Sequence, residues 1–198
     1  MKLFLTLILL CFIVSDSNSK VVGKVINTIE DAKSIGVEND SLSIFKTVNK
    51  FLQWYKVNYK VANAFKFTFT DSKGNYQVNM KECNKYLAYL QSSLFISDTY
   101  VQEWKKYFEM KVEYFAAYPM KEGPPEGFDV DLILMTQEPE LVLNNIKNLP
   151  MKIAELTPDK AILHIEADYG YEIDLSRVSG KWKIDYISPL NDDLNLNK

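Results

Sequence analysis

The chain has 198 residues, of which 47% are apolar and 25% charged, and a formal net charge of −3 at pH 7, values that are ordinary for a globular protein. Nearly all of its basic residues are lysines, with Arg177 the only arginine, and we expect no cluster of lysines on any one element. Because guanidinium groups are the favoured ligands of phosphates and base edges, this composition argues against nucleic-acid binding.

The first residues are typical of a secretory signal peptide. Lys2 precedes an apolar run of 12 residues at 3–14, and small polar residues follow up to Ser19. The run is shorter than the roughly 20 residues that a membrane-spanning helix needs. We therefore expect cleavage after Ser17 or Ser19 and an exported chain, periplasmic or extracellular, that contains no stable membrane span. An uncleaved membrane anchor is the alternative.

Cysteine and histidine are too few for the usual metal sites. Cleavage would leave Cys83 as the single cysteine, which excludes a disulfide within the chain, and His164 is the only histidine. A zinc site needs several such ligands, so we predict no metal and no cofactor. Cys83 lies in a helical pattern, where a buried and unreactive thiol is expected.

The N-terminal half of the sequence predicts helices. Residues 21–39 suggest a short, weakly periodic helix or arm, so we divide the chain into a signal peptide at 1–19, an arm at 20–40, a domain at 41–190 and a flexible tail at 191–198. Asp40 or Ser41 is the expected cap of a strong amphipathic helix. Its apolar residues recur at helical spacing: Ile44, Val48, Phe51, Leu52, Tyr55 and Tyr59.

The next segments predict a hairpin and two more helices. Alternating phenylalanines before an Asp-Ser-Lys-Gly-Asn turn at 71–75 indicate a small hairpin or an irregular excursion. Helical patterns follow at 79–94 and 98–118. Pro119 and the Pro-Pro pair at 124–125 end the helical half, because proline cannot donate the next backbone hydrogen bond.

The C-terminal half predicts four consecutive antiparallel strands at 151–157, 160–169, 171–178 and 181–188, and hence an α+β fold with the helices on one face of the sheet. The residues expected to face the helices are Ala161, Leu163, Ile165, Ala167, Tyr171, Ile173, Leu175, Trp182, Ile184 and Tyr186. The residues expected on the solvated face are Ile162, His164, Glu166, Asp168, Glu172, Asp174, Lys181, Lys183, Asp185 and Ile187.

Asp129 and Asp131 follow the Pro-Pro corner and alternate with apolar residues. On a strand both would point to the same side. Such a pair suits a structural role first, as an acceptor for nearby backbone amides or as a solvated pair. General acid/base chemistry is an alternative, and so is calcium binding with help from Glu122, Glu126 and Glu138.

Two further groups are candidates for function. His164 would have to serve any imidazole-based mechanism, although the strand pattern places it on the outer face, where a surface or interface role is expected. Most aromatic residues of the third helix should belong to the core, with a surplus that lines the mouth of a pocket. The ligand-pocket candidates are Trp104, Tyr107, Phe108, Tyr114, Tyr118 and Trp182.

Three helices followed by a four-strand meander that ends in GKWKIDYI resemble the nuclear transport factor 2-like superfamily. Within it, FLQWYKVNYK, GFDVDLIL and DKAILHIEADYGYEIDLSRVSGKWKIDYI resemble an exported bacterial domain of unknown function. The resemblance spans 41–189 and implies a cystatin-like cone, with a curved sheet around the helices and a pocket at its open end. The superfamily includes ketosteroid isomerase, dehydratases, polyketide cyclases and modules that only bind or assemble, so it implies no single function.

The sequence favours an exported, non-enzymatic binding or interaction module over an enzyme. Catalytic members of the superfamily carry an acid/base group in the pocket, whereas the inner-face positions of this chain are apolar or aromatic. The partner is an unidentified small apolar ligand or a protein, with a homodimer and a role in neutralising a partner protein left open. The alternative is a small isomerase-like or hydrolase-like enzyme that uses Asp129, Asp131 or His164.

Overall fold

The computed structural model describes residues 18–166 and 170–190, and the side chains of 37–166 and 170–190. Contacts divide the chain into two units, Met1–Asp40 and Ser41–Lys198, and all the residues of the hydrophobic core belong to the second. The expected signal peptide, except for its last two residues, lies outside the described residues. So do the expected tail, Ala167 and Asp168.

The longest element is helix α1, Asn18–Ala62, which runs for 45 residues without interruption. The expected cap at Asp40 or Ser41 is therefore wrong. Neither residue stops a helix by itself, and the glycines upstream lower helix stability by only about 1 kcal/mol each. From Ile44 onward the expected apolar stripe is buried up to Tyr55, whereas Tyr59 is half-buried.

The other expected helices are confirmed as α2, Met80–Gln91, and α3, Asp98–Ala117. Each begins at a side-chain cap: Asn79 accepts from the amide of Glu82 at 3.3 Å, and Ser97 from that of Tyr100 at 3.2 Å. The hairpin is also present, as β1, Thr68–Thr70, and β2, Tyr76–Val78.

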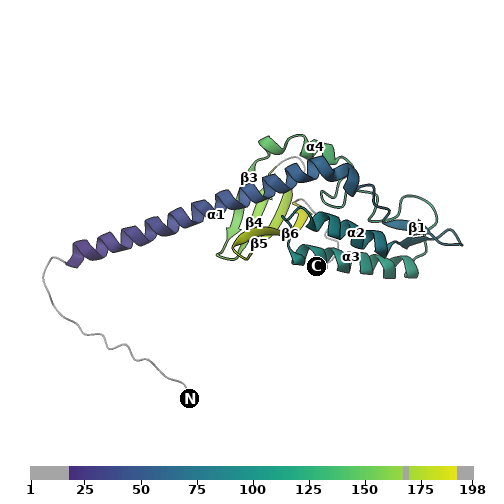
Figure 1. Ribbon diagram of the computed structural model, residues 1–198, viewed down its shortest axis with the longest axis horizontal. Helices are drawn as coiled ribbons and strands as arrows, with labels where there is room; N and C mark the ends of the chain where they lie inside the picture. The colour runs from purple at the N-terminus through teal and green to yellow at the C-terminus, as the bar shows by residue number, and fades with distance from the viewer. Residues whose placement is uncertain (1–17, 167–169, 191–198) are drawn as a thin grey trace, which may run out of the picture. The chain divides into compact units, whose positions relative to one another are not determined.

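All four expected strands of the sheet are present: β3, Met151–Leu156; β4, Lys160–Ile165; β5, Tyr171–Val178; and β6, Lys181–Pro189. They pair antiparallel in chain order and form an open sheet that is neither closed nor strongly curled (Figure 1). The α+β class is therefore confirmed, with helices first and the sheet last. Short helices that the sequence did not predict, α4 at Pro139–Leu143 and η1 at Ile146–Asn148, lead into β3.

Two segments outside the sheet pack against it: helix α1 and the residues that precede α3. The C-terminal half of α1 crosses the strands (Figure 1), where the Asn49 amide lies 3.8 Å from the sulfur of Met151 on β3. The segment before α3 covers the β6 edge, because Ser97 donates to the carbonyl of Ile184 at 2.9 Å and the amide of Ile184 donates to Phe95 at 2.9 Å. The backbone amide and carbonyl of Ile184 on that edge are thereby paired.

A bulge changes the inner face of the last strand. Asp174 pairs with Tyr186 but the next residue, Leu175, pairs with Ile184, so Asp185 is an extra residue in β6. Such an insertion reverses the side to which later residues point. Tyr186, expected inside, is 46% exposed, and Ile187, expected outside, is 5% exposed.

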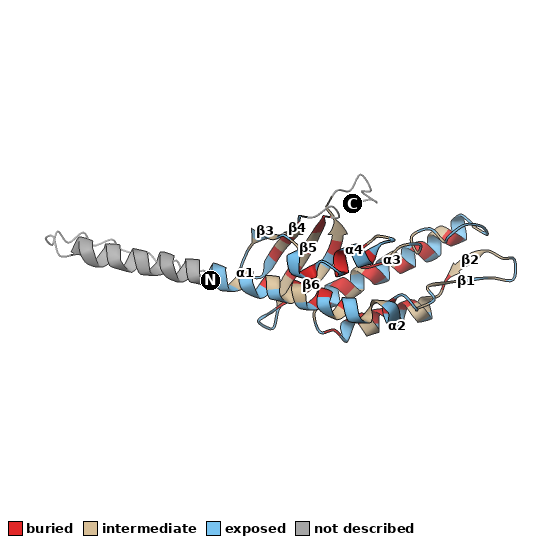
Figure 2. Cartoon of the chain, turned by 90° about the horizontal axis from the view of Figure 1, so that it is seen from above, coloured by how far each residue is buried: buried red, intermediate tan, exposed pale blue. Residues whose placement is uncertain are grey.

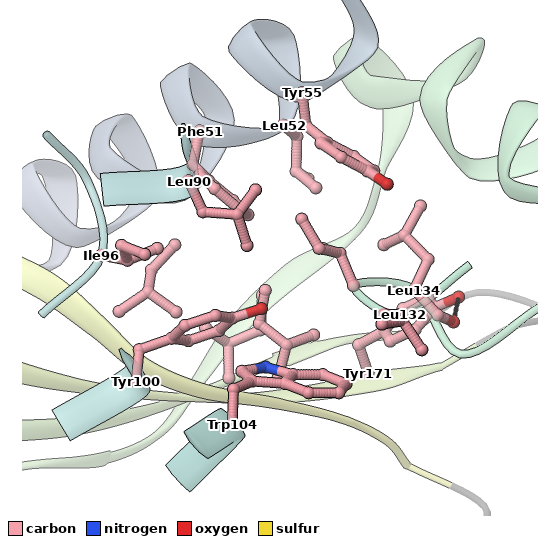
Figure 3. Close-up of a cluster of buried hydrophobic side chains, with 14 of the residues drawn as sticks. Phe51, Leu52, Tyr55, Leu90, Ile96, Tyr100, Trp104, Leu132, Leu134 and Tyr171 are labelled. Carbon is pink, nitrogen blue, oxygen red and sulfur yellow. Dashed lines mark hydrogen bonds between the residues drawn. The ribbon is translucent and has the colours of Figure 1, made fainter. Parts of the chain in front are cut away.

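The core contains residues of α1, α2 and α3, Leu132, Ile133 and Leu134 from the segment after the Pro-Pro corner, and the inner face of the sheet. Figure 2 shows buried residues alternating with exposed ones along the helices and strands. In the close-up, Phe51, Leu52 and Tyr55 of α1 point away from the helix into the core, where Phe51 lies beside Leu90 (Figure 3). No helix within the described residues has both the length and the apolar character that crossing a membrane requires.

The bulge makes the packing of β6 testable. Because Ile187 is buried and Tyr186 is not, Ile187→Ala should lower the free energy of unfolding by about 3 kcal/mol. Tyr186→Ala should lower it by less than about 1 kcal/mol. Urea unfolding followed by tryptophan fluorescence measures both, and the reverse order would mean that β6 continues without the bulge.

Candidate functional site

The segment after the Pro-Pro corner forms a tight turn and not a strand. The amide of Asp131 donates to the carbonyl of Thr136 at 2.9 Å, an isolated bridge that closes the turn. Asp131 is 5% exposed, whereas Asp129 is exposed. The expectation that both aspartates point to one side of a strand is therefore wrong. The physical reason is that an aspartate side chain can bond to the amides that follow it, which competes with strand pairing.

Both oxygens of the buried Asp131 carboxylate accept hydrogen bonds from inside the protein. Its Oδ1 accepts from the amides of Ile133 at 3.1 Å and Leu134 at 2.8 Å. Its Oδ2 accepts from the Tyr55 hydroxyl and from the side-chain amide of Asn63 at 2.9 Å. The carboxylate thus joins the end of α1 to the turn that precedes α4.

This network holds Tyr55 in its neutral form. Burial raises the pKa of the Tyr55 phenol far above its ordinary value, and the negative charge of Asp131 raises it further. The phenol therefore stays a donor to the carboxylate at every physiological pH. A carboxylate offers about four acceptor positions, and here four donors use them, so none remains for a substrate proton or a calcium ion.

A second buried charge, Lys111 of α3, holds residues 126–127, which follow the Pro-Pro pair, against that helix. The Lys111 side chain is 9% exposed, and its ammonium lies 3.6 Å from Glu126 and 4.9 Å from the centre of the Tyr114 ring. Tyr107 donates to the carbonyl of Gly127 at 2.9 Å, and Tyr114 to Glu126 at 2.6 Å. A buried ammonium is tolerated only with such partners, so this cluster holds residues 126–127 against α3.

The electrostatics of this cluster are mutually consistent. The hydrogen bond from Tyr114 and the charge of Lys111 lower the pKa of Glu126, and the same hydrogen bond raises the pKa of Tyr114. Burial, followed by the charges of Asp129 and Glu126, raises the pKa of Tyr107. Because the folded pKa of Glu126 is depressed, its stabilising contribution is present above its unfolded pKa and is lost as the pH falls through the folded one.

His164 lies on the outer face of β4, as expected, opposite Glu172 of β5. Its Nε2 lies 3.1 Å from a carboxylate oxygen of Glu172, and both side chains are partly exposed. Within the described residues, no hydrogen bond or ion pair joins His164 to Asp129 or Asp131. The structure therefore does not bring the three acid/base candidates into one site.

The six pocket candidates belong to separate aromatic contacts. The Trp104 ring centre lies 5.2 Å from that of Tyr107 and 5.7 Å from that of Phe108. The ring centres of Tyr114 and Tyr118 are 5.1 Å apart, and the Arg177 guanidinium lies 4.6 Å from the centre of the Trp182 ring. Trp104, Phe108 and Trp182 are buried, whereas Tyr118 is 63% exposed. The pocket that they were expected to line stays a prediction.

A hollow of about 180 Å³ lies elsewhere, between the segment after α1 and the corner. It contains none of the six candidates and is lined by Asn63, Phe65, Lys66, Phe67, Thr68, Phe128 and Val130. Sites for drug-sized molecules usually measure about 300–1,000 Å³, so this hollow suits a few waters or one side chain of a partner. Asn63 connects it to the Asp131 network.

The remaining candidates have structural roles. Cys83 is buried, as expected, and burial raises the pKa of its thiol to about 12, so little thiolate forms at neutral pH. Within the described residues, no group of three or more histidine, cysteine, aspartate or glutamate side chains is placed to hold a metal ion.

Sequence reasoning missed Lys111, Tyr55 and Asn63 as parts of these networks. One signal was present: Lys111 falls on the same helical stripe as Trp104, Phe108 and Phe115, all of which are buried. A buried lysine in an apolar stripe needs a partner of opposite charge, and Glu122 and Glu126 beside the Pro-Pro pair were the candidates in the sequence. Nothing in the sequence pairs Asn63 with Asp131, since 68 residues separate them.

No family model, curated protein or solved structure matches the chain. The structure shows an α+β order of helices followed by an antiparallel sheet, and no match identifies a superfamily for the chain. The function has to be inferred from the geometry of this chain.

The Asp131 network predicts unequal effects for the two aspartates. Asp131→Asn places an amide donor among groups that already donate, and should lower the free energy of unfolding by about 2–3 kcal/mol. Asp129→Asn should change it by less than about 0.5 kcal/mol, because this side chain is exposed. Urea unfolding of both variants is the measurement. Equal, small effects would show that the Asp131 carboxylate is not engaged by the fold.

The Lys111 cluster predicts a strict requirement for glycine at position 127. Gly127 has φ +82°, and a Cβ there would lie 2.6 Å from Cε of Lys111. Gly127→Ala should therefore cost about 3 kcal/mol or more of unfolding free energy, from backbone strain and overpacking together. Gly123→Ala is the matched control, since Gly123 has φ +77° but no neighbour within 4 Å. If both variants lose the same free energy of unfolding, Lys111 does not pack closely against residue 127.

Proposed function

We propose that this chain is an exported module that acts by binding a partner and not by catalysis. One observation carries the proposal: the Asp131 carboxylate, the best-placed acid/base candidate, is buried and is used in full by four donors of the fold. A general acid or base must lie within hydrogen-bond reach of the substrate proton. A carboxylate in this state acts as a structural acceptor.

The other candidates support the same proposal. Asp129 is exposed beside the corner, and His164 is paired with Glu172 on the sheet. Catalytic proton transfer usually takes place in a cleft that excludes water and brings several polar groups together. An isomerase-like or hydrolase-like enzyme remains the alternative function, but the described side chains do not assemble these groups.

The expected location and superfamily belong to this proposal as well. Export rests on the N-terminal sequence pattern of a charged residue, an apolar run and small polar residues. The order of α2, α3 and the β3–β6 meander supports a nuclear transport factor 2-like fold, although the open sheet departs from the cone of that superfamily. That superfamily contains modules that bind or assemble, as proposed here.

A comparison of host strains separates binding from catalysis. One strain carries the wild-type chain, and the other carries the double variant Asp129→Asn, His164→Gln, which removes both accessible acid/base candidates. At equal protein levels, the small-molecule contents of the two strains should be the same. A compound that accumulates only in the variant strain would contradict the proposal and identify a substrate.

A further inference from the structure

The outward side of α1 carries lysines and aliphatic residues in one stripe. Opposite the buried stripe, at spacings of three, four and seven residues, lies a set of exposed side chains that we name the lysine face: Leu42, Lys46, Lys50, Val57, Lys60 and Val61. Lys56 borders it and Lys66 follows the helix, both exposed. The expectation that no element concentrates lysines is therefore wrong for this helix.

The charge of this region is opposite to that of the rest of the chain. Residues 41–70 contain five lysines and no aspartate or glutamate, which gives +5. Since the whole chain carries −3, all other residues together carry −8. In a chain with an isoelectric point of about 5.3, such a local excess produces a positive field on one side of α1.

The three lysines of the face and the bordering Lys56 are not neutralised by ion pairs within the described residues. Of the ion pairs that join described residues, none involves Lys46, Lys50, Lys56 or Lys60. The pKa of Glu140 on α4 is lowered by its own backbone amide, by a hydrogen bond from Tyr59 and by the charge of Lys60, so this carboxylate lies near one lysine of the face. Lys46, Lys50 and Lys56 have no ion pair within the described residues, so the face keeps a net positive charge.

The residue types of the face favour a lipid surface over a protein or a nucleic acid. Protein interfaces are enriched in aromatic residues and arginine and depleted in lysine, and nucleic-acid sites use arginine forks and stacked aromatics. Here the charged groups are lysines, and the exposed apolar residues between them are aliphatic: Leu42 at 59%, Val57 at 82% and Val61 at 51%. Clusters of about 4–8 basic residues on a helix are typical of binding to anionic lipids.

We propose that the lysine face docks on the surface of a bilayer that contains anionic phospholipid. The ammonium groups contact lipid phosphates, and the three aliphatic side chains enter the boundary between headgroups and acyl chains. From Leu42 to Val61 the helix extends about 28 Å, so all of these groups can reach one flat surface. The inference deepens the proposed binding function, for which it names the partner, and its biological meaning rests on that function.

Binding to vesicles tests this surface. The full chain is sedimented with vesicles of phosphatidylcholine alone and with vesicles that also contain phosphatidylglycerol, and the ratio of the two affinities is measured. The apolar segment at 3–14 contributes to both affinities, so the ratio reports the charge-dependent part. The wild-type chain should prefer the anionic vesicles, and the preference should fall with added salt.

Two matched variants remove the same number of charges. K46Q/K50Q/K56Q/K60Q removes four lysines from α1, and the control K81Q/K105Q/K121Q/K181Q removes four exposed lysines elsewhere. The first should reduce the preference for anionic vesicles on the order of 100-fold, whereas the control should change it by less than about threefold. Urea midpoints should stay equal to that of the wild type, since every substituted lysine is exposed.

Several results would overturn the inference. These are a wild-type chain with no preference for anionic vesicles, a lysine-face variant that keeps its preference, and a control that loses as much as the variant. A dimer that only the lysine-face variant fails to form would assign the face to a second copy of the chain. None of these results depends on the comparison of strains, so a failure here leaves the distinction between binding and catalysis intact.

Discussion

The carboxylate of Asp131 ties the end of α1 to the turn that leads toward the sheet, through Tyr55 and Asn63 on one oxygen and two backbone amides on the other. A buried carboxylate is costly unless its acceptor positions are filled, so these four donors must keep their places. The direction in which the chain leaves the helical half depends on them. The adjoining Lys111 cluster fixes the opposite end of the same corner.

This use of charge inside the fold has a consequence for function. The two most distinctive charged groups of the interior, Asp131 and Lys111, are committed to the corner, and the hollow beside Asn63 is small. What remains available to a partner is the surface, where the C-terminal half of α1 combines an excess of lysine with exposed aliphatic residues. The charged groups of the interior thus hold the fold together, and the outside of α1 is the surface for which we propose binding.

Much of the fold could be predicted from the sequence, because the helices and strands depend on local periodicity. The stripes of α2 and α3, and the alternation of β3 to β6, are local patterns of apolar residues. The misses have specific causes. The continuation of α1 through Asp40 reflects the weakness of a single capping residue, and the bulge at Asp185 depends on cross-strand register, which no local pattern contains. The Asp131 network depends on residues 68 and 76 positions apart in the chain, so the sequence suggested the carboxylate but not its partners.

The central claim is that the Asp131 carboxylate belongs to the fold, and a double-mutant cycle with Tyr55 tests it most directly. Urea unfolding is measured for Tyr55→Phe, Asp131→Asn and the double variant. A structural hydrogen bond predicts a coupling free energy above about 1 kcal/mol between the two positions. Effects that add to within about 0.3 kcal/mol would contradict the claim, because Asp131 would then be free of Tyr55 and available for chemistry.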